Sequence, residues 1–367
     1  MRYSDHVAHL LTLRGRADHR VLLLPHYRLR GRLLYSCLSD APAELSPTQA
    51  RLLRRSDGRR TLAGIVSTSR DAQAALLLLR AAVITTIPPR RTKEPRERWL
   101  VFSPHRDDAA ISIGGWLARA CTTARIVVAN LVTRSNSISV HIRGGQVRGE
   151  PRVSKWRQIE DELAASILGV ELEKGFLRDA PLRPPGGDYF GAFVAATHRL
   201  FSRVKPVHVV APLGLGHSDH RFTHEAVIHN LSRWATEPRS LSISFYEDLP
   251  YAFDNPREMA VRLRQLRSNI GRPLVPHLID IRSTMPVKLS AVAAYRSQEI
   301  LEDFGAGLLS YAGVLGRMRP AAPGWPCERI WEMKGLDTSR GSASNDPSSS
   351  RWRHGQFRAR AGSSSDG

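Results

Sequence analysis

The fold is decided by one stretch at residues 99–120, WLVFSPHRDDAAISIGGWLARA. Its first four residues are apolar and predict a buried strand, which Pro104 ends because proline has no N–H to donate. The residues from about 109 onward are apolar and compatible with a helix. His105, Asp107 and Asp108 lie in the turn between the two, which is where open α/β sheets place their ligand sites.

This turn predicts a cation site, because two carboxylates and an imidazole within four residues are unfavourable together unless a cation holds them. Imidazole and carboxylate ligands suit Zn²⁺, and an open catalytic site uses three protein ligands and a water. His105 and Asp108 can both face one ion, which leaves Asp107 beside them as a base. We expect the third ligand from residues 216–220, GHSDH, which also follow an apolar strand-like run.

Each cluster also has a plain structural interpretation. A pair of aspartates after a strand is more often a helix N-cap than a catalytic pair, and two histidines three residues apart are more often surface or capping residues. The shared context decides between the interpretations, because both clusters follow predicted strands. Two clusters at one edge of one sheet predict a single functional site.

Both clusters resemble motifs of the LmbE-like, PIG-L family of zinc-dependent de-N-acetylases. The similar motifs are PHRDD at residues 104–108, followed by the glycine pair at 114–115, and GHSDHR at residues 216–221. Three further segments are similar to the family, at residues 157–170, 245–251 and 288–298. The resemblance covers residues 98–298 and implies that Zn²⁺ is the cofactor.

The resemblance implies hydrolysis of an N-acetyl group on an amino sugar or glycosylated small molecule, such as an N-acetylglucosamine-type intermediate of natural-product biosynthesis. Arg106, Ala109 and Leu215 depart from the usual family residues. These departures put the substrate pocket in question but leave the metal ligands unchanged.

The expected roles follow from the resemblance and from the positions of the residues. Asp107 takes a proton from water and returns it to the leaving amine, and His217, oriented by Asp219, stabilises the oxyanion. His220 is the third metal ligand because it lies at the start of a predicted helix, whereas His217 lies in a glycine-flanked loop. A closed structural site using both histidines is disfavoured, because structural zinc sites usually contain cysteine.

The composition fits a soluble protein of two domains and a tail, with 42% hydrophobic residues and a formal charge of +20. Arginines scattered along the chain, rather than clustered with aromatic residues, argue against a nucleic-acid partner. No apolar run reaches the length of a membrane span, and the N-terminus has no signal-peptide pattern. Three widely spaced cysteines argue for a reducing cytoplasm.

Residues 99–335 alternate apolar strands and helices, which predicts an α/β catalytic domain with a Rossmann-like, mainly parallel sheet and flanking helices. We expect a mobile loop over the site at residues 134–150. Residues 88–98 are proline-rich and charged and predict a linker. Residues 336–367 have almost nothing to bury and predict a disordered tail.

Residues 1–87 predict a small winged-helix-like α+β domain. We expect strands at residues 21–24 and 31–35 to pair as a hairpin, and helices at 49–53 and 71–82. The segment at residues 50–65 resembles the PqqD-like domains that hold leader peptides. This resemblance leaves an alternative function open, in which the enzyme is an amide hydrolase or deacylase acting on a peptide-derived product that this domain presents. A plain stabilising or lid domain is the other interpretation.

Overall fold

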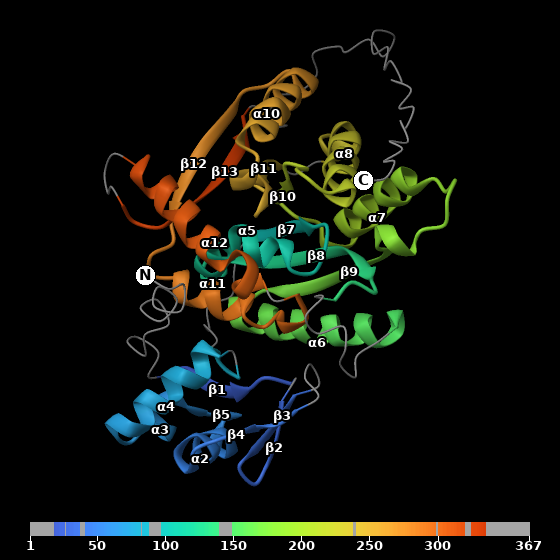
Figure 1. Ribbon diagram of the computed structural model, residues 1–367. Helices are drawn as coiled ribbons and strands as arrows, with labels where there is room; N and C mark the ends of the chain where they lie inside the picture. Colours follow the sequence, from blue (N-terminus) through green and yellow to red (C-terminus); the bar gives the residue numbers. More distant parts are fainter. Residues whose placement is uncertain are drawn as a thin grey trace, which may run out of the picture.

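A seven-stranded sheet forms the centre of the computed structural model (Figure 1). The structure describes residues 18–25, 27–36, 41–81, 83–87, 97–138, 149–237, 240–298, 300–319 and 324–334. From edge to edge the strands are β12 (Leu274–Asp280), β13 (Cys327–Met333), β11 (Ser242–Tyr246), β10 (His208–Pro212), β7 (Glu97–Ser103), β8 (Ala124–Arg134) and β9 (Glu171–Arg178).

Strands β11, β10, β7, β8 and β9 are parallel, which confirms the predicted α/β class with a mainly parallel sheet. Leu100, Val101 and Phe102 of β7 are completely buried, as the unbroken apolar run predicts for a strand covered on both faces. The chain leaves β7 toward β8 on one side and later returns to β10 on the other. The carboxyl ends of β7 and β10 therefore flank a topological switch point, where such sheets bind ligands.

Helices cover both faces of this sheet (Figure 1). One layer contains α5 (Asp108–Ala120), α6 (Glu150–Leu168) and α11 (Met285–Val292), which pack against one another. The other layer contains α7 (Tyr189–Val204) and α8 (Ser218–Trp234). The ring of Trp234 is stacked on that of Phe201 at a centroid distance of 4.4 Å, which joins α7 and α8 in the core.

The C-terminal part differs most from the prediction. Strands β12 and β13 are antiparallel to their neighbours and extend the sheet beyond β11. The sequence predicts one helix at residues 287–300, but the structure divides this region into α11, the short 3₁₀ turn η3 (Arg296–Gln298) and the start of α12 (Ile300–Arg317). Two further helices, α9 (Tyr251–Asp254) and α10 (Pro256–Ile270), follow β11, and the 3₁₀ turn η2 (Ala180–Leu182) follows β9.

The N-terminal module contains two small antiparallel sheets, ordered β5-β1-β6 and β2-β3-β4. Its strands are β1 (Arg20–Leu23), β2 (Tyr27–Arg30), β3 (Leu33–Ser36), β4 (Ala43–Glu44), β5 (Asp57–Thr61) and β6 (Ile84–Ile87). Its helices are α2 (Pro47–Arg55), α3 (Leu62–Ile65) and α4 (Ser69–Arg80). Ser46 caps α2, with Pro47 at its first position, as the sequence predicts.

The predicted hairpin in this module is wrong. Strand β1 pairs with β5 and β6, whereas β3 pairs with β2 and β4, so the two apolar runs enter different sheets. Leu24 and Ile87 join the large core, and the module lies against α6 (Figure 1). The winged-helix class, the domain boundaries and the PqqD-like character stay predictions. The linker lies almost entirely outside the described residues, as do the tail and residues 139–148 of the predicted loop.

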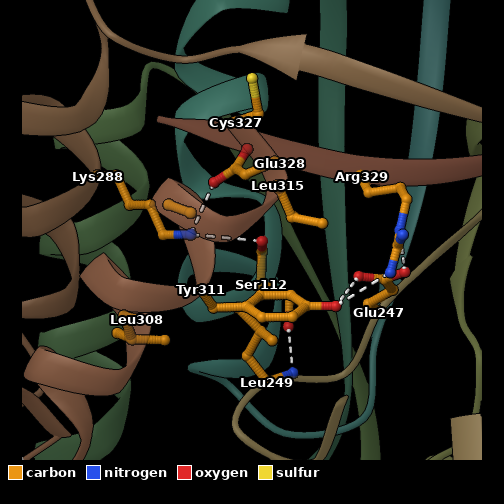
Figure 2. A pocket seen from close by; sticks show the side chains of 11 residues that line it. Ser112, Glu247, Leu249, Lys288, Leu308, Tyr311, Leu315, Cys327, Glu328 and Arg329 are labelled. Carbon is orange, nitrogen blue, oxygen red and sulfur yellow. Dashed lines mark hydrogen bonds and ion pairs between the residues drawn. The ribbon is translucent and has the colours of Figure 1, made fainter. Parts of the chain in front are cut away.

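Helix α5, which begins directly after the turn at residues 104–107, is kinked at Ile113, whose φ and ψ are −131° and 19°. Glu328 of β13 accepts hydrogen bonds from the N–H groups of Gly115 (3.0 Å) and Trp116 (2.6 Å), and pairs with Lys288 Nζ at 2.7 Å (Figure 2). A Cβ on Gly115 would lie 2.8 Å from Ile281, so this close approach requires glycine. The kink is thus a packed feature with paired backbone groups.

Candidate metal centre

Three side chains predicted as ligands converge at the carboxyl end of the sheet. His105 follows β7, Asp108 begins α5, and His220 lies in the first turn of α8. Asp108 Oδ2 lies 3.2 Å from His105 Nδ1 and 3.2 Å from His220 Nε2. All three offer ligand atoms within 4.8 Å of one another.

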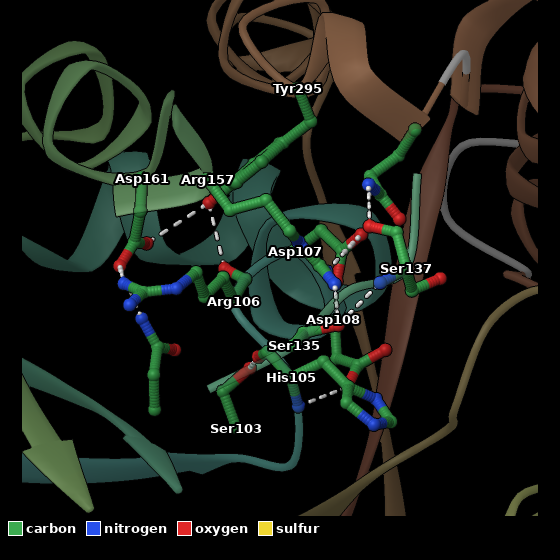
Figure 3. Close-up of polar contacts among 12 residues, drawn as sticks. Ser103, His105, Arg106, Asp107, Asp108, Ser135, Ser137, Arg157, Asp161 and Tyr295 are labelled. Carbon is green, nitrogen blue, oxygen red and sulfur yellow. Dashed lines mark hydrogen bonds and ion pairs between the residues drawn. The ribbon is translucent and has the colours of Figure 1, made fainter. Parts of the chain in front are cut away.

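The turn before α5 is fixed by its own hydrogen bonds (Figure 3). The Ser103 hydroxyl donates to the carbonyl of His105 (2.6 Å) and accepts from the N–H of Ala109 (3.1 Å). The N–H of His105 donates to Asp108 Oδ2 at 2.7 Å. These bonds hold His105 and Asp108 on the same side of the turn.

His220 is oriented by Asp248, which lies two residues after the end of β11. Its Nδ1 lies 2.7 Å from Asp248 Oδ1, and the other oxygen of this carboxylate accepts the N–H groups of Gly214 (2.9 Å) and Leu215 (3.1 Å). An imidazole that donates from Nδ1 to a carboxylate presents the lone pair of Nε2 on the opposite side. His220 Nε2 therefore faces Asp108, as the predicted role of a ligand requires.

The donor set of this cluster fits a divalent cation. Burial lowers the pKa of His105, but its contacts with Asp108 and Asp219 outweigh this effect and raise the pKa to about 9. The pKa of His220 is raised well above its ordinary value, because Asp108 and Asp248 outweigh the effect of burial. The surrounding carboxylates thus favour positive charge at this point, and two imidazoles with one carboxylate match Zn²⁺.

Asp107 lies beside the cluster and is 8% exposed. Burial raises the pKa of its carboxyl, while Arg157 of α6 acts in the opposite direction from 3.5 Å. The Ser135 hydroxyl lies 3.2 Å from Arg157 Nη1 and donates to Asp179 Oδ2 at 2.6 Å. Asp107 is therefore a carboxylate with a raised pKa that one arginine keeps oriented, which is the environment of a general base.

His217 lies at the mouth of the site, with its side chain 35% exposed. It is the N-cap of α8, and its Nδ1 accepts a hydrogen bond from the main-chain N–H of Asp219 at 3.2 Å. Its pKa is lowered, mainly by burial and then by His105. A neutral imidazole that accepts at Nδ1 carries its proton on Nε2, which can donate to an oxygen.

The side chain of Asp219 lies closer to His105 than to His217. Its Oδ2 is 3.2 Å from His105 Nε2 and 3.9 Å from His217 Nδ1. Its other oxygen pairs with Arg183 Nη2 at 2.5 Å. The sequence-based role of Asp219, orienting His217, thus involves its main chain more directly than its carboxylate.

Comparisons with known proteins agree with this site. The family model described as PIG-L, GlcNAc-PI de-N-acetylase, matches residues 100–231, a range that contains both clusters. The chain is 33% identical over 224 residues to 2'-N-acetylparomamine deacetylase of Streptomyces fradiae, covering 57% of this chain and 76% of that protein. The chain belongs to the PIG-L family. The resemblance in the sequence motifs is thereby confirmed.

A second relative of this PIG-L protein is 1D-myo-inositol 2-acetamido-2-deoxy-alpha-D-glucopyranoside deacetylase of Actinosynnema mirum, with 25% identity over 260 residues, 62% of this chain and 89% of the relative. The solved structure of the zinc-inhibited form of teicoplanin deacetylase Orf2 superposes with a TM-score of 0.51 at 22% identity. This match covers 64% of this chain and 97% of that one, and shows a shared fold. Among the described helices, none is long and apolar enough to cross a bilayer.

A buried network supports the turn at residues 104–107 of this PIG-L protein (Figure 3). Arg106 is 5% exposed and pairs with Asp161 of α6 at 3.0 Å. The hydroxyl of Tyr295 donates to the main-chain oxygen of Arg106 at 2.7 Å and lies 3.2 Å from Asp161 Oδ1. Arg106, which departs from the usual family residue, therefore points into the core and away from a substrate.

Four residues around this PIG-L site lie outside the set that sequence reasoning assigned: Arg157, Arg183, Asp248 and Tyr295. Asp248 carried a readable signal, because it follows an apolar strand-like run at the same sheet edge as the two clusters. Arg183 carried none, since its partner Asp219 lies 36 residues further along the chain. Their positions depend on tertiary contacts.

Proposed function

We propose that this chain is a zinc-dependent hydrolase that removes the N-acetyl group from an amino sugar or a glycosylated small molecule. The observation that carries the proposal is the convergence of His105, Asp108 and His220 beside the buried carboxyl of Asp107. Membership of a de-N-acetylase family and two relatives named as deacetylases of acetylated amino-sugar compounds support the same chemistry.

The three ligands would hold Zn²⁺, which supplies Lewis acidity and lowers the pKa of water to about 7. Asp107 takes the proton of the attacking water and then delivers it to the leaving amine. Its raised pKa favours this second step, and Arg157 favours the ionised form needed for the first. His217 donates its Nε2 proton to the oxyanion, because its Nδ1 is occupied by the N–H of Asp219.

The substrate would lie against the loop that follows β9 and against His217. Asp179 and Arg157 are linked through Ser135 and present polar groups next to Asp107, an arrangement suited to sugar hydroxyls. We propose a cytoplasmic location, which the free thiols of Cys121 and Cys327 support. The small-molecule substrate is the expected partner.

A second candidate is an amide hydrolase whose peptide-derived substrate is presented by the N-terminal module. Strand β3 of this module exposes Leu33 (39%) and Tyr35 (38%), and β2 exposes Arg28 and Arg30. Apolar and basic side chains on two adjacent strands are suited to an extended acidic peptide. Such a peptide should bind the full chain, and the Leu33→Ser and Tyr35→Ser variant should lose that binding while retaining amino-sugar hydrolysis.

The test of the main proposal is a mass-spectrometric screen of N-acetylated amino sugars and aminoglycosides for loss of an acetyl group, using protein purified without a metal-binding tag. Elemental analysis should find about one zinc per chain, the stoichiometry of an open catalytic site. Removal of the metal should abolish turnover, and added Zn²⁺ should restore it. Turnover that survives complete metal removal would refute the proposal.

A further inference from the structure

Asp219 connects the metal site with a buried arginine. The carboxylate is fully buried, with one oxygen 3.2 Å from His105 Nε2 and the other 2.5 Å from Arg183 Nη2. His105 Nδ1 faces Asp108 on the opposite edge of the ring, at 3.2 Å. Arg183, Asp219, His105 and Asp108 therefore form one continuous chain of charged contacts that ends at the metal ligands.

Arg183 is held in this position by three contacts of its own. Its guanidinium carbon lies 5.3 Å from the ring centroid of Tyr189 and 5.4 Å from that of Phe193. Its Nε donates to the carbonyl of Arg178 at 2.8 Å. Two aromatic rings of α7 and one main-chain oxygen therefore fix the guanidinium, and its side chain is only 7% exposed.

The two histidines near Asp219 use different groups of this residue. His217 accepts a hydrogen bond from the main-chain N–H of Asp219, whereas His105 contacts its carboxylate. A substitution of the carboxylate should therefore alter His105 and leave the tautomer of His217 unchanged. This separation makes the two roles experimentally distinguishable.

We propose that Asp219 and Arg183 are positioning residues for the metal ligand His105. The Asp219 carboxylate accepts the Nε2 proton of His105, so that the lone pair of Nδ1 faces Asp108 and His220. Arg183 neutralises and orients that carboxylate, which otherwise would be a buried unpaired charge. The inference rests on the proposed metal site. It assigns the Asp219 side chain to positioning the ligand His105, and not to orienting His217.

The test measures Zn²⁺ affinity of the full chain by competition with a chromophoric chelator, without substrate. Asp219→Asn and Arg183→Met should each weaken Zn²⁺ binding by about 10- to 100-fold, the usual effect of removing a group that orients a metal-ligating histidine. Arg183→Lys should recover part of the loss. Arg178→Met is the matched control, because that side chain is exposed at the end of β9 and the main-chain oxygen that accepts from Arg183 is kept, so the affinity should stay unchanged.

His217→Ala provides the opposite control, since it should lower kcat while its Zn²⁺ affinity stays within about threefold of the parent, below the change caused by losing an orienting group. In the zinc-loaded protein, ¹⁵N NMR should show the single His105 ring proton on Nε2, and Arg183→Met should weaken that signal. If Asp219→Asn and Arg183→Met bind Zn²⁺ as tightly as the parent, the inference is overturned.

The two proposals can fail separately. If the affinities follow the expected order but the screen finds no deacetylation, the proposed function fails and the positioning role stands. If deacetylation is found and Asp219→Asn lowers kcat like His217→Ala with unchanged Zn²⁺ affinity, then Asp219 acts through His217. Should Asp219→Asn fail to fold by circular dichroism, Arg183→Met and Arg183→Lys decide the question.

Discussion

Replacement of Asp248 by asparagine tests whether this carboxylate orients His220 and stabilises the loop at residues 214–215. The carboxylate serves two sides at once, His220 Nδ1 at 2.7 Å and the N–H groups of Gly214 and Leu215 at 2.9 and 3.1 Å. An amide has one oxygen, so it can accept from only one of these sides. Asp248→Asn must therefore lose either the hydrogen bonds from Gly214 and Leu215 or the hydrogen bond from His220.

The structure gives a magnitude for each outcome. If the amide oxygen stays with His220, two buried N–H donors lose their acceptor, at about 1–3 kcal/mol each, so the free energy of unfolding falls by about 2–6 kcal/mol. If the amide nitrogen faces His220, Nδ1 becomes an acceptor and the ring proton moves to Nε2, the ligand atom. Zn²⁺ affinity should then fall by about 100-fold or more, the upper end of the effect of losing an orienting group.

Two measurements on the same variant separate these outcomes. Denaturant unfolding of the metal-free protein measures the free energy of unfolding, which falls if the N–H groups of Gly214 and Leu215 lose their acceptor. Chelator competition measures the Zn²⁺ affinity. The matched control is Asp254→Asn, which changes an exposed carboxylate on the adjacent α9 and should alter neither quantity. If Asp248→Asn retains both the stability and the affinity of the parent protein, the argument from its three contacts is refuted.

Three further predictions follow from other parts of the structure. Asp107→Asn should lower kcat by about 10²- to 10⁴-fold, the usual contribution of a general base, while elemental analysis still finds zinc; turnover near the parent value would remove Asp107 from the mechanism. Burial lowers the pKa of His224 to about 4, so the parent loses stability as the pH falls from about 6.5 to 4, by up to about 3 kcal/mol. His224→Asn, which can retain the bond to the Pro212 carbonyl, should lack that part of the pH dependence in thermal unfolding, and an unchanged slope would contradict the prediction. Glu328→Ala should reduce the free energy of unfolding by about 3–5 kcal/mol in denaturant titrations, because it leaves Lys288 buried and unpaired; a loss below about 1 kcal/mol would show that the pair contributes little.

The central sheet could be predicted from the sequence because its inner strands are covered on both faces. Strands β7 and β10 contain short unbroken apolar runs, and the residues that follow the carboxyl ends of parallel strands share one edge of the sheet. That geometry is why the sequence alone groups His105, Asp108 and His220. His105 and Asp108 follow the end of β7 at Ser103, and His220 lies in the first turn of the helix after β10.

The C-terminal part could be predicted only in pieces, a strand at residues 277–281 and a helix at 287–300, because its elements have no simple period. Strand β12 is only partly buried along its length, and α12 contains Gly307, where a Cβ would lie 2.5 Å from the ring of Phe253. A glycine that allows a close helix contact looks like a helix breaker in the sequence alone. Arg183 could not be found for a related reason, since its partner Asp219 is distant in the chain.

In the N-terminal module, the sequence predicts strands but not which strands pair with one another. Val21 belongs to the module's own core, whereas Leu24, three residues later, belongs to the large one. The apolar run was readable, but nothing in its pattern told which sheet or which core each residue would join. Strand pairing in small antiparallel sheets depends on such assignments.

The contact between Glu328 and the kink of α5 has a consequence for the order in which the chain folds. The carboxylate that completes this helix lies 212 and 213 residues after the two N–H groups that it accepts. During synthesis the segment bearing Asp107 and Asp108 emerges long before β13, so the kink stays without its acceptor until β13 pairs with β11. Contacts of such large sequence separation form late and slowly. We expect that chains ending before residue 327 would bind zinc poorly even though they contain every ligand.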